Sequence, residues 1–123
     1  MANEFTVTTA MRYSSGNDFV NLKDSYQVTQ TSVPLGGAPG VQLIGTTHVA
    51  LNVSGLLNLG MAYFKNLDDT NFVDIGVDVS AAFHPLVRLK PGEATVLRLT
   101  ATSAPYAKAD TAAVRLQANV YEE

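Results

Sequence analysis

The feature that most constrains this chain is an alternation of apolar and polar residues with a period of two. It is clearest over 73–79 and 114–121, where every second residue is valine, isoleucine, leucine or alanine. Side chains of a β-strand point alternately to opposite faces, so this pattern predicts half-buried strands. The same alternation over 5–13 and 49–53 predicts two more.

Weaker alternation predicts four further strands, over 19–29, 57–65, 86–90 and 94–101, which brings the expected number to eight. No apolar stripe with helical spacing extends beyond about two turns, and at most 107–112 is expected to form a turn of helix. Residues typical of turns separate the strands, over 14–17, 34–40, 66–69, 91–92 and 103–105.

Eight short strands favour an all-β fold, a two-sheet β-sandwich of jelly-roll type, with an immunoglobulin-like sandwich as the alternative. The absence of tryptophan and cysteine argues against a true immunoglobulin domain. We expect residues 1–123 to form one domain, because this is a common domain size. Within it, 34–40 is expected to be a loop, and 1–8 an extended N-terminal arm that adds a strand to a neighbouring subunit.

The surface is expected to be poor in charge, because only 15% of the residues are charged against about 25% in an average domain. With 46% hydrophobic residues, this favours self-association or docking into an assembly. The eight lysines and arginines are scattered and the net charge is −3, so we expect no direct binding to nucleic acid. No run of 18 apolar residues occurs, so no membrane span is expected.

No motif in the sequence predicts a catalytic, cofactor-binding or metal-binding residue, and we do not expect an enzyme. His48 and His84 lack a second ligand at metal spacing, so both are expected to be ordinary surface or loop residues. The four acidic residues that come closest to a calcium site lack the order of an EF-hand loop. The four are Asp68, Asp69, Asp74 and Asp78. We expect Asp68 to stabilise a turn, and Asp74 and Asp78 to lie on one face that is exposed to solvent or to a partner.

Three residues are predicted to lie at an interface with other subunits. Phe5 and Val7 belong to the expected N-terminal arm, and Tyr121 points away from the core-facing Val120 near the end of the chain. Aromatic side chains in such positions are frequent interface anchors. By the same alternation, Tyr13 and Tyr63 are expected to point inward.

Three segments carry a resemblance to a known group of proteins: YFKNLDDTNFVDIG at 63–76, RLKPGE at 88–93 and YAKADTA at 106–112. Their order resembles that in small proteins encoded among the virion structural genes of tailed bacteriophages, over roughly residues 57–123. The resemblance implies a virion protein assembled in the host cytoplasm, and it assigns no catalytic residue. Physically the segments are expected to contain a hairpin loop at 66–70, a tight turn at 91–92 and a polar loop at 108–111.

These observations together predict a capsid decoration, or cement, protein: a jelly-roll unit, expected to be a homotrimer, bound to the major capsid protein. A neck, tail or fibre-associated structural protein is the alternative within the virion. A carbohydrate-binding β-sandwich module is the alternative from another class, although the absence of tryptophan argues against it.

Overall fold

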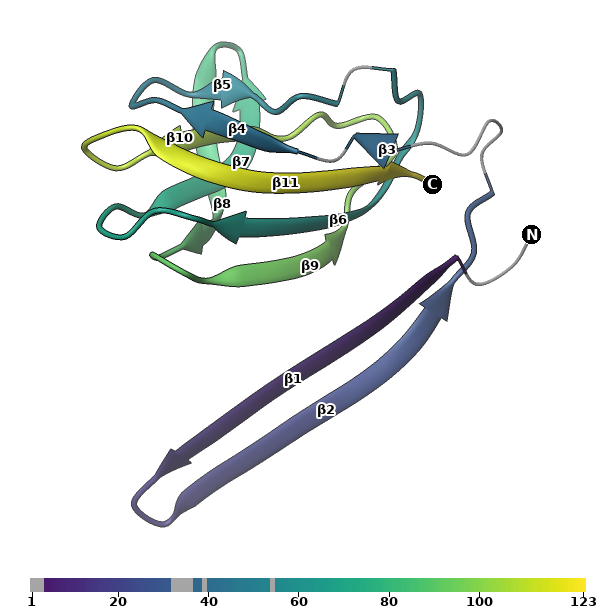
Figure 1. The fold of residues 1–123 in the computed structure, drawn as a ribbon, viewed down its shortest axis with the longest axis vertical. Coiled ribbons are helices and arrows are strands. Elements are labelled where there is room, and N and C mark those ends of the chain that lie inside the picture. Colours follow the sequence, from purple (N-terminus) through teal and green to yellow (C-terminus); the bar gives the residue numbers. More distant parts are fainter. Residues whose placement is uncertain (1–3, 32–36, 39, 54) are drawn as a thin grey trace. The chain divides into compact units, whose positions relative to one another are not determined.

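The computed structural model describes residues 4–31, 37–38, 40–53 and 55–123, and these contain strands but no helix. The all-β prediction is therefore confirmed. The chain divides into two compact units, Met1–Thr31 and Ser32–Glu123, whereas the sequence predicted one domain over 1–123. The first unit is a β-hairpin and the second is a sandwich of two sheets (Figure 1).

The hairpin consists of β1 (Phe5–Ser15) and β2 (Asp18–Val28), which pair antiparallel along their whole length. Gly16 and Asn17 form the loop, and Gly16 has a φ of 58°. A residue with positive φ in the first loop position is typical of a type II′ turn, whose twist matches that of the strands. The predicted turn at 14–17 is confirmed. Within the expected N-terminal arm, residues 5–8 are extended and pair with β2 of the same chain, and 1–3 lie outside the described residues.

The pairing register gives this hairpin one apolar and one polar face. Residues directly opposite each other share a face, and four apolar pairs fall together: Phe5–Val28, Val7–Tyr26, Met11–Leu22 and Tyr13–Val20. The opposite face carries pairs such as Thr6–Gln27, Thr8–Ser25 and Arg12–Asn21. The expectation that Tyr13 points into a core is wrong, because its side chain is 53% exposed and β1 hydrogen-bonds to no described strand of the sandwich.

The sandwich unit contains two antiparallel sheets that lie one behind the other in Figure 1. The strands of the first sheet are β3 (Gly37–Ala38), β4 (Val41–Ile44), β6 (Leu59–Asn66), β9 (Ala94–Arg98) and β11 (Val114–Glu122). In this sheet β11 pairs with β6 on one side and with both β4 and the short β3 on the other, and β6 also pairs with β9. The second sheet has the order β5-β10-β7-β8, with strands β5 (Val49–Ala50), β7 (Val73–Val79), β8 (Ala82–Leu89) and β10 (Tyr106–Ala109).

The core lies between these two sheets and is built from the apolar half of each alternation. Phe64 and Leu116 of the first sheet and Val73 of the second have no exposed surface. The cluster contains Ile44, Leu51, Leu59, Ala62, Phe64, Val73, Ile75, Leu89, Ala107, Ala109, Val114, Leu116 and Val120. The strands predicted over 73–79 and 114–121 are thus confirmed. Their apolar faces point into the core at Val73, Ile75, Val114, Leu116 and Val120, whereas Val79 at the end of its strand is 54% exposed.

The prediction of a hairpin loop at 66–70 is wrong, because β6 and β7 belong to different sheets. The segment crosses from one sheet to the other around the buried side chain of Asn66. Its Nδ2 donates hydrogen bonds to the carbonyl oxygens of Asn71 and Leu89, both at 2.9 Å, and its Oδ1 accepts one from the Asp68 amide at 2.8 Å. A buried amide with every bond made fixes such a crossing.

The predicted turn at 91–92 is confirmed. The Glu93 amide donates to the Lys90 carbonyl at 3.0 Å, and Gly92 has a φ of 81°; with Pro91 before it, this is a type II turn. The helical turn proposed for 107–112 is wrong, because Tyr106–Ala109 forms β10 between β5 and β7. Its four residues are too few to distinguish the two periods by sequence.

Candidate functional site

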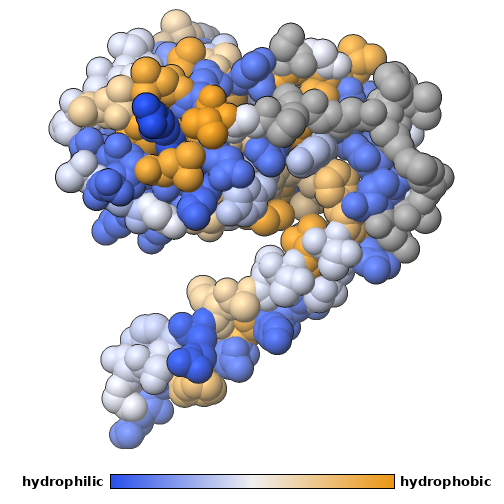
Figure 2. Space-filling view, in the orientation of Figure 1, coloured by the Kyte–Doolittle hydropathy of each residue, from blue (hydrophilic) through white to orange (hydrophobic). Residues whose placement is uncertain are grey.

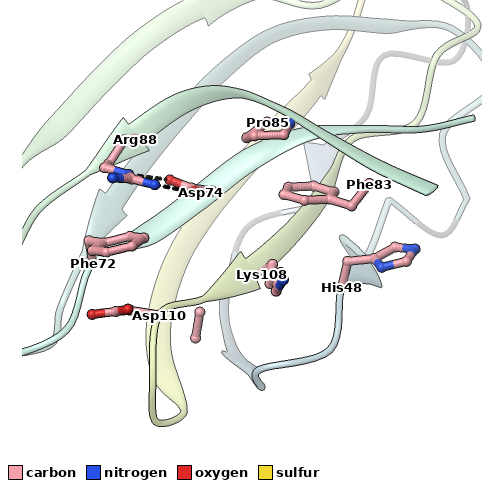
Figure 3. A pocket seen from close by; sticks show the side chains of 9 residues that line it. His48, Phe72, Asp74, Phe83, Pro85, Arg88, Lys108 and Asp110 are labelled. Atoms are coloured by element: carbon pink, nitrogen blue, oxygen red, sulfur yellow. Dashed lines mark hydrogen bonds and ion pairs between the residues drawn. The ribbon is translucent and has the colours of Figure 1, made fainter.

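A hollow with clustered polar side chains lies on the outer face of the second sheet (Figure 3). Adjacent strands build it: Asp74 of β7 stands opposite Arg88 of β8 on one side and Lys108 of β10 on the other. Because the neighbouring Val73 and Ile75 point into the core, these three side chains point outward. The pocket has a volume of about 450 Å³ and is lined by His48, Phe72, Asp74, Phe83, Pro85, Arg88, Lys108, Ala109 and Asp110.

Arg88 is held in this pocket by three groups. Its Nε and Nη2 donate hydrogen bonds to the two carboxylate oxygens of Asp74 at 2.8 and 3.0 Å, and the guanidinium lies 3.8 Å from the centre of the Phe72 ring. The hydrogen bonds to Asp74, aided by the charges of Asp74 and Asp110, raise the pKa of Arg88 above its usual value. A bidentate pair of this kind fixes the orientation of both side chains.

His48 forms the other wall with Phe83. Its ring lies 5.6 Å from that of Phe83 at an interplanar angle of 21° and 5.8 Å from that of Tyr106, and its Nε2 lies 2.8 Å from Oδ2 of Asp78. His48 was expected to be an ordinary surface residue; its side chain is 23% exposed and paired. His84 lies exposed within β8, where a loop or strand entry was expected.

The turn beside Asp78 is strained. Ser80 and Ala81 connect β7 to β8 with φ values of 53° and 67°, the left-handed conformation that a type I′ turn requires and that glycine or asparagine normally supplies. Oδ1 of Asp78 accepts a hydrogen bond from the Ala81 amide at 3.0 Å. One carboxylate therefore holds both the turn and the His48 ring.

The pocket is suited to binding by stacking and hydrogen bonds. Two acids, Asp74 and Asp110, balance Arg88 and Lys108, and within the described residues the side chain of Lys108 has no hydrogen-bond or ion-pair partner. The lining side chains include no serine, threonine or cysteine. The part of the chain that the structure describes also contains no group of three side chains arranged to hold a metal ion.

A second candidate surface is apolar and lies on the outer face of the first sheet. Val41 and Leu43 of β4 are 58% and 66% exposed, and Leu43 stands opposite Arg115 of β11. Leu67, also exposed, donates its amide to the Arg115 carbonyl at 3.0 Å. We call these four residues the β4 patch; Figure 2 shows apolar side chains around a strongly hydrophilic one on the sandwich unit.

The third candidate surface is the apolar face of the hairpin. Five of its residues are between 41% and 60% exposed, and we call them the apolar hairpin face: Met11, Tyr13, Val20, Leu22 and Tyr26. The predicted interface residues on the same face are less accessible, since Phe5 is half-buried and Val7 is 6% exposed. Tyr121 is half-buried opposite Gly37.

Sequence reasoning missed the exposed part of the hairpin because it treated 5–13 and 19–29 as layers of one sandwich. The signal was present in the two-residue loop at 16–17, which joins arms of equal length. The glycine-rich stretch 34–40 was interpreted as a loop inside one domain. Residues 34–36 and 39 lie outside the described residues, 37–38 form β3, and the division between the units falls just before this stretch.

No helix among the described residues is long and apolar enough to span a membrane. Comparisons of the chain with models of known protein families, with curated proteins and with solved structures give no match.

Proposed function

We propose that this chain is a structural protein of a bacteriophage virion, a capsid decoration protein that binds the major capsid lattice as a homotrimer and stabilises the head. One observation carries the proposal: exposed apolar surface occurs on both units, as the β4 patch and as the apolar hairpin face. Chains that act as monomers seldom expose contiguous apolar surface, whereas components of assemblies bury it in contacts. The low proportion of charged residues, 15%, supports the same conclusion.

Two separate surfaces suit a decoration protein, because such a protein contacts its own copies as well as the lattice. In the β4 patch, Arg115, a residue type that is enriched among interface hot spots, lies beside exposed aliphatic side chains. An oligomer that presents three such patches binds a symmetric lattice firmly even when each contact is weak. We assign the lattice contact to the β4 patch.

We also propose that the sandwich is a jelly roll. Its strand pairs nest around the turn at 79–82: β7 with β8, β6 with β9, β5 with β10 and β4 with β11. A long antiparallel hairpin rolled into two sheets has this pairing. Jelly rolls form many viral capsid domains, which supports a virion role, although a fold alone does not specify a function.

The test is binding of the purified chain to heads of the encoding phage that lack it. We expect saturable binding, weakened by Leu43→Asp in the β4 patch. Val79→Asp is the matched control, because Val79 is also exposed, at 54%, but lies at the end of β7 in the other sheet. Absence of binding to the heads, or equal loss with both variants, would contradict the proposal.

The copy number in purified virions separates a decoration protein from a neck, tail or fibre-associated protein. A decoration protein is present in numbers comparable to the major capsid protein, and a neck or tail component in a few copies per particle. Quantitative mass spectrometry of the virion measures this ratio.

A carbohydrate-binding module is the second candidate, and the pocket on the second sheet favours it. Phe72 and Phe83 provide aromatic surface, and Lys108 and Asp110 provide hydrogen-bonding groups at its rim. The test is a glycan array with the wild-type chain and with Lys108→Ala, using Lys23→Ala on the hairpin as the matched control. A signal lost only with Lys108→Ala supports this candidate, and a blank array excludes it for the glycans tested.

A further inference from the structure

Among the described strands β1 and β2 pair only with each other, and a ribbon of two strands does not hold together by its own contacts. Isolated hairpins are marginally stable in water, and a further layer against the apolar face is needed for independent stability. β1 and β2 nevertheless pair over eleven residues each. Something must therefore cover this face in the working protein.

We propose that the occupant is the same face of other copies of this chain, so that the hairpin is the self-association element. The first argument is the area. Five side chains about half exposed, at roughly 200 Å² for each full side chain, present about 500 Å². Two such faces bury about 1,000 Å² together, which is about the area that a specific interface between two proteins needs.

The second argument is the charge distribution. The pairs Met11–Leu22 and Tyr13–Val20 carry no ionised group, and the carboxylates of Asp18 and Asp24 flank them on the same face. A charged partner would thus find nothing to pair with among these four side chains, whereas this uncharged stretch is complementary to the same stretch of another copy. The charged groups Arg12 and Lys23 lie on the opposite face, where they stay in water when the apolar faces meet.

The third argument is shape. Two ribbons can stack face to face as the two layers of a sandwich do, about 10 Å apart. Three ribbons can instead surround a three-fold axis with their apolar faces inward. In either arrangement Leu22 approaches its counterpart in another copy, and Lys23, its neighbour in β2, points outward.

The absence of cysteine from the chain makes the test direct. A Leu22→Cys variant carries one thiol on the apolar hairpin face, and Lys23→Cys carries one on the polar face, one residue away. We expect a short thiol-to-thiol crosslinker to join copies of the Leu22→Cys chain and to leave the Lys23→Cys chain largely unjoined. Equal crosslinking of both variants, or none with Leu22→Cys, would overturn the proposal.

Light scattering of the full-length purified chain gives the second measurement. We expect a mass of two or three times 13.1 kDa. The Leu22→Asp variant should weaken association by roughly tenfold or more, because it replaces a buried leucine with a charge, while Lys23→Asp should leave it within about twofold. A circular dichroism melt of each variant checks that the sandwich remains folded.

Each other occupant gives a different result. A monomer whose Leu22→Cys thiol resists modification shows that the chain covers the face itself, and a monomer whose thiol reacts freely shows a face left for another protein; both overturn the proposal. An oligomer insensitive to Leu22→Asp associates through another surface and overturns it too. These experiments use the chain alone, so a chain that associates but does not bind heads retains this inference and loses the proposed function.

Discussion

The hairpin of residues 5–28 and the sandwich of residues 37–123 use the same alternation of apolar and polar side chains, but the apolar half ends in different surroundings. In the sandwich, Phe64 and Leu116 are completely buried between two sheets, whereas Met11 and Leu22 of the hairpin are 60% and 56% exposed. A period of two specifies that a segment is a strand and which side chains share a face. It does not specify whether a second layer exists to cover that face.

The largest expected effect comes from a substitution that weakens the pairing of β7 with β8 in the sandwich. A Cβ at Gly76 would overlap the His84 carbonyl oxygen and lie 2.8 Å from Cα of Pro85, where β8 bulges against β7. Backbone atoms cannot yield as a side chain does, so we expect Gly76→Ala to cost about 3 kcal/mol or more. Urea unfolding measures the loss. Gly45→Ala is the control, since a Cβ there meets nothing within 4 Å, and an equal loss in both variants would contradict this reasoning.

The same substitution made in both regions tests the difference in burial. Phe64→Ala should lower the free energy of unfolding by about 3–5 kcal/mol, because it empties a fully packed site. Phe19→Ala should change it by about 0.5 kcal/mol or less, since Phe19 is 62% exposed on the polar face of the hairpin. Thermal unfolding followed by circular dichroism compares them. A large effect of Phe19→Ala would mean that this side of the hairpin is covered as well.

The turns of the two regions also differ. The hairpin turn places Gly16 at its left-handed position, whereas the 79–82 turn of the sandwich places Ser80 and Ala81 there. Relief of the left-handed strain outweighs the added freedom of the unfolded chain, so Ala81→Gly should raise the free energy of unfolding by about 0.5–1 kcal/mol. Ala82→Gly, in the first position of β8, should lower it by a similar amount. If both substitutions destabilise, the Ala81 conformation is not strained.

How much of this could be predicted from sequence follows from the same comparison. The all-β class, most strands and the 91–92 turn were predictable, because alternation and proline–glycine pairs act locally. The crossing at 66–71 was not, because it depends on where Asn66 finds its partners in the folded chain, at Leu89 as well as nearby. The pocket was not predictable either: Asp74 and Asp78 were placed on one outer face, but their partners Arg88 and His48 come from other strands or loops.

The smallest expected effect concerns acid. The loop at 66–71 is held by a carboxylate, since Oδ2 of Asp68 accepts hydrogen bonds from the amides of Thr70 at 3.0 Å and Asn71 at 2.7 Å, whereas the hairpin turn depends on Gly16. The bonds from Asn71 and Thr70 lower the pKa of Asp68 below its usual value of 3.8. A lowered pKa in the folded chain means that the stabilisation is complete above the unfolded pKa and is lost as the pH falls through the folded one.

We therefore expect the Thr70 and Asn71 amide resonances to shift, and their protection from exchange relative to the intrinsic rate to fall, only below about pH 4. The Gly16 amide should not follow the same titration. Asp68→Asn keeps an acceptor oxygen and removes the ionisation, so it should abolish the pH dependence at Thr70 and Asn71. A titration of these amides that persists in Asp68→Asn would show that another group controls the loop. The two regions would then differ in burial and turn conformation, but neither turn would depend on the ionisation of Asp68.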